Sequence, residues 1–217
     1  GIGGRDGAHA EYLSLPNENL VLVPVMVSDE QAVFAEPLAA AWGIGEMVDL
    51  HADTRLAVIG DGKLGLLCAM SLRLKCDHVL NIGKHRSKLD IAASAGVETI
   101  PVNDLNDAHS KGFDVVVEAS GSESGFETAL DLVRPRGTIV LKSTFQGTPT
   151  WNSSRVVVEE ITVVGSRCGR FAPAVELLAS GRIDVTRLID SEMPLGEGVN
   201  AMNEASRKGA LKILLRP

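Results

Sequence analysis

The segment from Arg55 to Met70 constrains the fold most, because it joins an apolar strand-like run to an apolar helix-like run through a glycine-patterned turn. The turn consists of Gly60, Asp61, Gly62, Lys63, Leu64 and Gly65. In a strand–turn–helix unit, the first glycine allows a sharp turn, the second lets backbone N–H groups approach a pyrophosphate, and the third lets the helix pack on the strand. The positive end of the helix dipole then faces the phosphates. The pattern therefore predicts a dinucleotide-binding site.

Strand-like and helix-like segments alternate after Leu56. Six short apolar segments are predicted as strands, at residues 56–60, 79–83, 97–102, 114–119, 137–143 and 161–166. Segments with apolar residues at three- and four-residue steps are predicted as helices, at residues 63–75, 87–95 and 123–133. Short apolar strands linked by helices indicate an α/β fold, in which helices cover both faces of a parallel sheet.

The two ends of the chain follow a different pattern. Within residues 7–24 we predict two short strands separated by a turn at residues 16–19. A helix is expected to begin at Ser28, which can form a capping box with Gln31, and Pro37 is expected to bend or interrupt it. After Phe171 the pattern predicts a helix to residue 181, an extended piece at 188–189, a helix at 197–207 and a strand at 211–215.

Composition argues against several classes of protein. The net charge is −7 and no stretch is rich in Lys and Arg, which argues against a nucleic-acid or anionic-membrane partner. Apolar runs are too short for a membrane span. The three cysteines lack the close spacing of metal or redox motifs and suit a reducing compartment. We therefore predict a cytoplasmic protein.

Several motifs occur in an order that resembles a known superfamily. They are residues 7–12 (Gly-Ala-His-Ala-Glu-Tyr), Pro16, residues 36–39 (Glu-Pro-Leu-Ala), the turn at 60–65, residues 118–121 (Glu-Ala-Ser-Gly), residues 134–137 (Arg-Pro-Arg-Gly) and residues 164–166 (Val-Gly-Ser). Together they resemble the medium-chain dehydrogenase/reductase superfamily, especially its zinc-dependent alcohol, polyol and threonine dehydrogenase-like members. The resemblance implies a doubly wound Rossmann sheet of order 3-2-1-4-5-6 at residues 28–169, with parts of a GroES-like catalytic domain at 1–27 and 170–217.

The resemblance also implies that most of the N-terminal catalytic domain lies outside this chain, which we therefore expect to be a fragment of a longer enzyme or a truncated relative. In the family, that part carries the zinc ligands and the proton relay, so catalytic residues stay unassigned here. In polyol and threonine dehydrogenase-like relatives, an acid matching Glu36 lies at the catalytic zinc. The alternative for Glu36 is an ordinary acid in the first turn of a helix. One carboxylate cannot hold zinc alone, so zinc is expected only in a complete enzyme.

The end of the second predicted strand bears on the choice of cofactor. NAD-binding proteins usually place Asp or Glu there, where its carboxylate accepts a hydrogen bond from the ribose 2′-hydroxyl. This chain has Gly83, followed by Lys84, His85 and Arg86. Such basic side chains can bind a 2′-phosphate by charge-assisted hydrogen bonds. The sequence predicts NADP(H) in preference to NAD(H), and the alternative for the three basic residues is a solvated loop.

Residues after the later strands are expected to line the same crevice, because ligands of open α/β sheets bind beyond the carboxyl ends of the strands. These residues are Ser120, Gly121, Ser143 and Ser166. The resemblance adds Lys212, near a position where relatives place a basic residue against the pyrophosphate. The alternative for the serines is that they cap turns or helices.

Two functions remain open. The first is an oxidoreductase that transfers hydride between a nicotinamide dinucleotide and a small alcohol or carbonyl substrate. The second is a catalytically inactive or zinc-free NADP(H)-binding module, although such a module has no need of an acid at Glu36. The resemblance also implies a homo-oligomer formed by edge pairing of Rossmann sheets, with the strand at 161–166 as the candidate edge.

Overall fold

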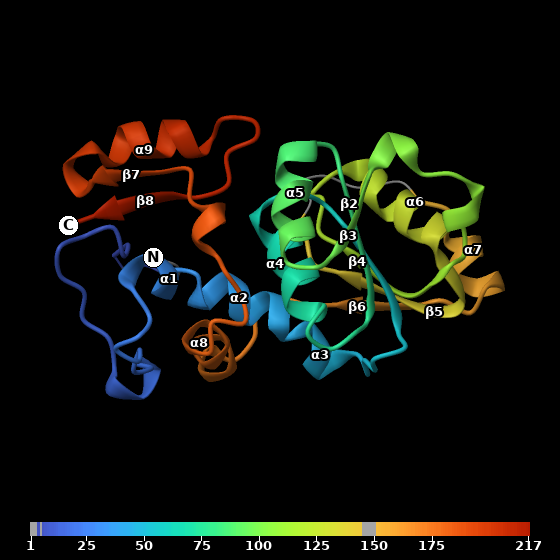
Figure 1. Ribbon diagram of the computed structural model, residues 1–217, viewed down its shortest axis with the longest axis horizontal. Helices are drawn as coiled ribbons and strands as arrows, with labels where there is room; N and C mark the ends of the chain where they lie inside the picture. Colours follow the sequence, from blue (N-terminus) through green and yellow to red (C-terminus); the bar gives the residue numbers. More distant parts are fainter. Residues whose placement is uncertain (1–3, 5, 145–150) are drawn as a thin grey trace.

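Six short apolar segments form one parallel sheet in the computed structural model, which describes residues 4, 6–144 and 151–217 (Figure 1). Across the sheet the strands are β3 (Glu98–Pro101), β2 (His78–Gly83), β1 (Arg55–Ile59), β4 (Phe113–Glu118), β5 (Val133–Leu141) and β6 (Thr162–Gly165). This arrangement confirms the predicted doubly wound α/β fold and its order 3-2-1-4-5-6. The division into domains at 27/28 and 169/170 stays a prediction.

Helices cover both faces of this sheet, as predicted. They include α4 (Lys63–Leu72), α5 (Arg86–Ser94) and α6 (Glu123–Leu132). Because side chains alternate along a strand, Leu56 and Val58 of β1 join the core beneath α4, while Ala57 and Ile59 join a second core beneath α6. Burial on both faces explains why β1 and β4, at the centre of the sheet, are largely apolar. Within the described part of the chain, no helix is long and apolar enough to cross a membrane.

Helix α2 (Ala35–Trp42) lies between the two ends of the molecule (Figure 1) and packs against α4 and α8 (Phe171–Ala179). The predicted capping box before it is confirmed: Ser28 Oγ accepts the N–H of Gln31 at 3.3 Å, and the Gln31 side chain accepts the N–H of Ser28 at 3.0 Å. The helix that begins there, α1 (Asp29–Ala32), ends before Pro37. Pro37 instead lies in the first turn of α2, where its missing N–H needs no partner.

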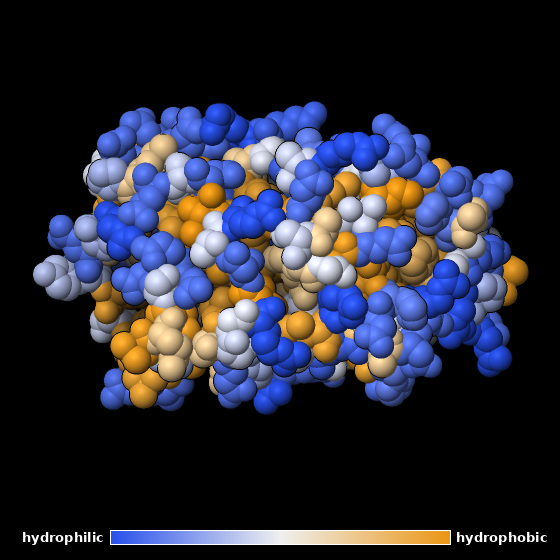
Figure 2. Space-filling model, in the orientation of Figure 1, coloured by the Kyte–Doolittle hydropathy of each residue, from blue (hydrophilic) through white to orange (hydrophobic). Residues whose placement is uncertain are grey.

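The two strands predicted within residues 7–24 are wrong. These residues contain only the short turn η1 (Asn17–Asn19), and no residue described before Arg55 is in a strand. A lone two-stranded hairpin is marginally stable in water, and neither of the two described sheets includes this segment. Its apolar side chains face outward, with Tyr12 90% and Leu22 94% exposed. Figure 2 shows apolar surface at the lower left, over this segment.

The C-terminal end forms a small sheet of two parallel strands, β7 (Ser191–Pro194) and β8 (Ile213–Arg216), covered by α9 (Gly198–Ala205) (Figure 1). The extended piece predicted at 188–189 is misplaced, because Leu188 ends the turn η4 (Thr186–Leu188) and the strand begins at Ser191. Other short segments are α3 (Ile44–Met47), η2 (Val102–Asp104), η3 (Asp107–His109) and η5 (Leu195–Glu197).

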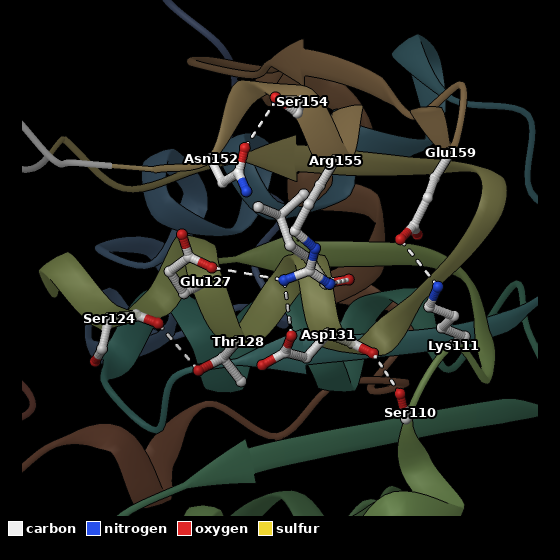
Figure 3. Close-up of polar contacts among 11 residues, drawn as sticks. Ser110, Lys111, Ser124, Glu127, Thr128, Asp131, Asn152, Ser154, Arg155 and Glu159 are labelled. Atoms are coloured by element: carbon white, nitrogen blue, oxygen red, sulfur yellow. Dashed lines mark hydrogen bonds and ion pairs between the residues drawn. The ribbon is translucent and has the colours of Figure 1, made fainter. Parts of the chain in front are cut away.

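One helix absent from the predictions, α7 (Ser153–Val158), is held on α6 by a polar cluster (Figure 3). Arg155 donates to the Asp131 carboxylate at 2.8 Å and to the carbonyl oxygen of Leu130 at 2.9 Å. Beside it, Lys111 pairs with Glu159 at 2.9 Å. These contacts fix the segment that leads into β6.

Candidate functional site

The carboxyl ends of four strands lie in one row across the sheet. Strand register places Ile59 opposite Glu118, Glu118 opposite Leu141, and Leu141 opposite Gly165. The chain order of the strands reverses between β1 and β4, and a crevice opens beyond the strands at such a point. A cavity of about 240 Å³ lies there. Its lining includes Gly60, Gly62, Gly83, Lys84, His85 and Ser120 of the predicted site.

Each glycine of the turn has the geometry that its predicted role requires. Gly60 has φ +126°, and a Cβ atom there would lie 2.6 Å from the carbonyl oxygen of Ala119. A Cβ at Gly65 would press on the carbonyl group of Gly60. A Cβ at Gly62 would meet no atom within 4 Å, and Gly62 caps α4 without a side-chain hydrogen bond. The first N–H groups of α4 therefore remain open to an anion.

The next two residues of the turn, Lys63 and Leu64, form the first turn of α4 and are half-buried. The apolar part of Leu64 packs on the core beneath that helix. Lys63 carries a positive charge at the same helix end, which adds to the field of the helix dipole there.

Asp61 joins the turn to the end of β2, a contact that the sequence did not predict. One carboxylate oxygen accepts the backbone N–H groups of Lys84 at 2.7 Å and His85 at 2.6 Å, and lies 2.9 Å from the His85 ring nitrogen Nδ1. Burial raises the pKa of Asp61, but the hydrogen bonds from His85 and Lys84 outweigh this and hold the pKa below its ordinary value. The only sequence signal was an acid between two glycines of the turn.

Two of the three basic residues after Gly83 already contact carboxylates of this chain. His85 contacts Asp61, and Arg86 pairs with Asp104 at 3.2 Å. The side chain of Lys84 is exposed beside the cavity. The predicted preference for NADP(H) stays a prediction, because these contacts leave the three basic side chains only partly available.

Glu118 accepts hydrogen bonds from residues that follow β4 and β5. Its carboxylate accepts the Ser120 N–H at 2.8 Å and the Ser120 hydroxyl at 2.5 Å, and also accepts the Ser143 hydroxyl. Glu118 is only 5% exposed. Both serine hydroxyls therefore turn toward a buried acid, while Gly121 is exposed with φ +64°, and the predicted contacts of these residues with a ligand stay a prediction. An acid at the end of an apolar strand was the signal for Glu118.

Lys142 holds Ser166 in a similar way. Its ammonium group donates to the carbonyl oxygen of Ser166 at 3.2 Å, to the Ser166 hydroxyl at 3.1 Å and to the carbonyl oxygen of Arg167 at 2.9 Å. Lys142 is 6% exposed, and this burial lowers its pKa. The sequence-based prediction included Ser166 but missed the lysine that positions it.

Lys212, Lys63 and Glu36 belong to one electrostatic neighbourhood at the start of α4. Burial lowers the pKa of Lys212, the charge of Lys63 lowers it further, and Glu36 opposes this. The Lys212 ammonium lies 5.1 Å from the ring centre of Phe34. Glu36 is exposed in the first turn of α2. Lys212 lines a different cavity from the one beside the glycine turn, so its predicted contact with the pyrophosphate stays a prediction.

Residues 64–180, more than half of the chain, match the family described as zinc-binding dehydrogenase. This chain belongs to that family. The match covers strands β2 to β6 and begins at Leu64, after β1 and most of the glycine turn. It therefore agrees with the superfamily that the ordered motifs indicated.

Curated relatives of this dehydrogenase family member are longer than the chain. It is 27% identical to D-xylulose reductase A of Aspergillus oryzae over 226 residues, which cover 97% of the chain and 63% of that relative. It is 27% identical to sorbitol dehydrogenase of Halalkalibacterium halodurans over 232 residues, covering 100% of the chain and 68% of that relative. The chain thus spans about two thirds of their length.

Solved structures share the fold of this family member. A Sinorhizobium meliloti protein bound to NADP has a TM-score of 0.88 at 24% identity, over 98% of this chain and 67% of that one. A short chain alcohol dehydrogenase of Escherichia coli in complex with NADH has a TM-score of 0.83 at 21% identity, over 94% of this chain and 64% of that one. Identities this low support a common fold.

The family description raises the question of zinc. A zinc site needs three or four converging His, Cys, Asp or Glu ligands. Across residues 4, 6–144 and 151–217, no three such side chains lie close enough to hold a metal ion. These residues alone do not fit a zinc centre, and the predicted role of Glu36 at zinc stays a prediction.

Proposed function

We propose that this chain binds a nicotinamide dinucleotide at the carboxyl end of its six-stranded sheet. The observation that carries the proposal is the open approach at Gly62, where the uncapped N-terminus of α4 faces a cavity at the switch point of the sheet. Lys63 and Lys212 add positive charge for the pyrophosphate. The structures with NADP and NADH support the nicotinamide class.

We propose that, in a protein with the full length of these relatives, the bound dinucleotide exchanges hydride with an alcohol or carbonyl carbon. The cofactor supplies the hydride chemistry, and the protein binds and orients both reactants. The names D-xylulose reductase and sorbitol dehydrogenase favour a polyol as the alcohol and a sugar ketone as the carbonyl compound. Because the described residues do not fit zinc, this part is expected to bind dinucleotide without turning substrate over.

Two further expectations form part of the proposal. We propose a cytoplasmic location, which is supported by the wide spacing of the three cysteines and by the acidic composition. We also propose a homo-oligomer that pairs the outer edge of β6, because β6 is an edge strand of the sheet and Thr162 and Val163 are exposed.

Titration of the purified chain with NADPH and with NADH at one ionic strength tests the proposal. We expect nicotinamide fluorescence to report saturable binding of both, with NADPH bound more tightly as the basic residues predict. ADP-ribose should displace them, because it carries the pyrophosphate that faces α4. The proposal is contradicted if neither dinucleotide shows saturable binding, or if ADP-ribose fails to compete.

Metal analysis addresses the catalytic half separately. After dialysis against a chelator, the purified chain is expected to contain no stoichiometric zinc, because a single carboxylate at Glu36 cannot hold the ion. Elemental mass spectrometry of the wild type and of Glu36→Gln supplies the measurement. Stoichiometric zinc that resists the chelator in the wild type would show that this expectation is wrong.

A further inference from the structure

We propose that Asp61 sets the balance between NAD(H) and NADP(H), by placing a carboxylate where the 2′ group of the adenosine ribose would lie. This inference rests on the proposed binding of a dinucleotide. It concerns a residue inside the glycine turn rather than the residue at the end of β2, where an acid usually recognises the ribose.

The geometry around Gly83 supports the view that position 61 supplies the carboxylate in place of an acid at position 83. A Cβ atom at Gly83 would lie 2.5 Å from the Asp61 Cβ atom and 2.8 Å from both its carboxyl carbon and the oxygen Oδ2. The Asp61 side chain thus occupies the space into which an acid at position 83 would begin to extend. Gly83 is required there because any larger residue would collide with Asp61. The chain therefore keeps an acid at this place, although its second strand ends in glycine.

The two carboxylate oxygens of Asp61 differ in their contacts. Oδ2 accepts the N–H groups of Lys84 and His85 and contacts the His85 ring, which orders the loop after β2. Asp61, Lys84 and His85 all line the cavity together with Gly60 and Gly62. Among the described residues, Oδ1 has neither a hydrogen-bond partner nor complete burial. An oxygen of this kind can accept a hydrogen bond from a ribose 2′-hydroxyl.

The same contacts work against a 2′-phosphate. A phosphate would meet the negative charge of Asp61, which is ionised at neutral pH because its pKa is lowered. The two backbone N–H groups that such a phosphate would use are already bound to Asp61. The positive charges of Lys84 and Arg86 favour a 2′-phosphate, although Arg86 also forms an ion pair with Asp104. Cofactor choice in this chain is therefore a balance between Asp61 and the basic residues of the loop.

The test compares Asp61→Asn with Asp90→Asn. Asparagine keeps a side-chain oxygen that can accept the N–H groups of Lys84 and His85. The loop after β2 therefore keeps these hydrogen bonds, while the negative charge is lost. Asp90 is an exposed acid on α5, outside the cavity lining, and its replacement makes the same change in net charge. Calorimetric titration with ADP-ribose and with ADP-ribose 2′-phosphate isolates the 2′ group, and titration with NADH and NADPH repeats the comparison on whole cofactors.

We expect Asp61→Asn to shift the affinity ratio toward the 2′-phosphorylated ligands by about tenfold at low ionic strength, and by less at high salt. Asp90→Asn is expected to leave the ratio unchanged. An unchanged ratio in Asp61→Asn, with both ligands still binding, would overturn the inference and leave the proposed function standing. If the wild type binds none of the four ligands, the proposed function fails and this inference fails with it.

Discussion

Replacing Gly65 with alanine is expected to reduce dinucleotide binding by about hundredfold or more, because an error of about 1 Å in a binding loop has an effect of this size. The new Cβ atom would press on the carbonyl oxygen of Gly60 and lie 2.8 Å from its carbonyl carbon. The Gly60 carbonyl cannot retreat freely, because its oxygen accepts a hydrogen bond from the buried Asn81 side chain at 2.9 Å. Either the turn or the start of α4 must move.

The same collision should lower the free energy of unfolding by about 1 to 3 kcal/mol, the usual cost of overpacking. Urea unfolding followed by circular dichroism measures this, and fluorescence titration with NADPH measures the loss of binding. Gly62→Ala is the matched control for stability, because its Cβ atom would meet nothing within 4 Å at φ −75°. Wild-type affinity in Gly65→Ala would show that the close contact between turn and helix relaxes easily.

The largest effect on stability is expected for Gly169→Ala. The added Cβ atom would fall on the carbonyl oxygen of Ala39, 2.7 Å from its carbonyl carbon and 3.2 Å from the Cα atom of Gly43. All three atoms belong to the backbone of α2 or its end, and the Ala39 oxygen already accepts the N–H of Gly43 at 2.9 Å. Relief therefore requires α2 to separate from the segment after β6.

Helix α2 packs against both α4 and α8, so its displacement opens the core on two sides. We expect Gly169→Ala to lower the free energy of unfolding by about 3 kcal/mol or more. For a chain of this size, that change corresponds to a fall in Tm of roughly 6 to 12 °C. Thermal unfolding followed by circular dichroism gives both values.

Gly165→Ala provides the control from the same part of the chain. A Cβ atom at Gly165, the last residue of β6, would meet nothing within 4 Å. Its Tm should stay close to that of the wild type, because surface substitutions without a clash usually change stability by less than about 0.5 kcal/mol. If Gly169→Ala unfolds at the same temperature as this control, the backbone of α2 does not lie in close contact with Gly169.

The sheet order and the glycine turn could be predicted because local patterns encode them. Apolar strands, helical periodicity and glycine spacing are all read within a few neighbouring residues. The predicted N-terminal strands failed for the opposite reason. A strand needs a partner, and the alternation between Gly7 and Pro24 says nothing about whether one is present.

The site was predictable in outline and not in its contacts. The strand-end residues Ser120, Ser143 and Ser166 follow from the rule that ligands bind beyond carboxyl ends. Their buried partners Glu118 and Lys142 were missed, because a charged residue at the end of an apolar strand shows no local sign of what it binds. Asp61 was missed because its contacts lie more than twenty residues along the chain.

The contact between Asp61 and Gly83 also bears on how this chain can evolve. Positions 61 and 83 compete for one volume, so the effect of a substitution at either depends on the residue at the other. An acid introduced at position 83 alone would collide with Asp61, whereas a small residue at position 61 would remove the contacts of less than 3 Å that its Cβ atom meets. Such strong epistasis means that moving the acid from position 61 to position 83 requires paired substitutions, and that single-site libraries would miss this exchange.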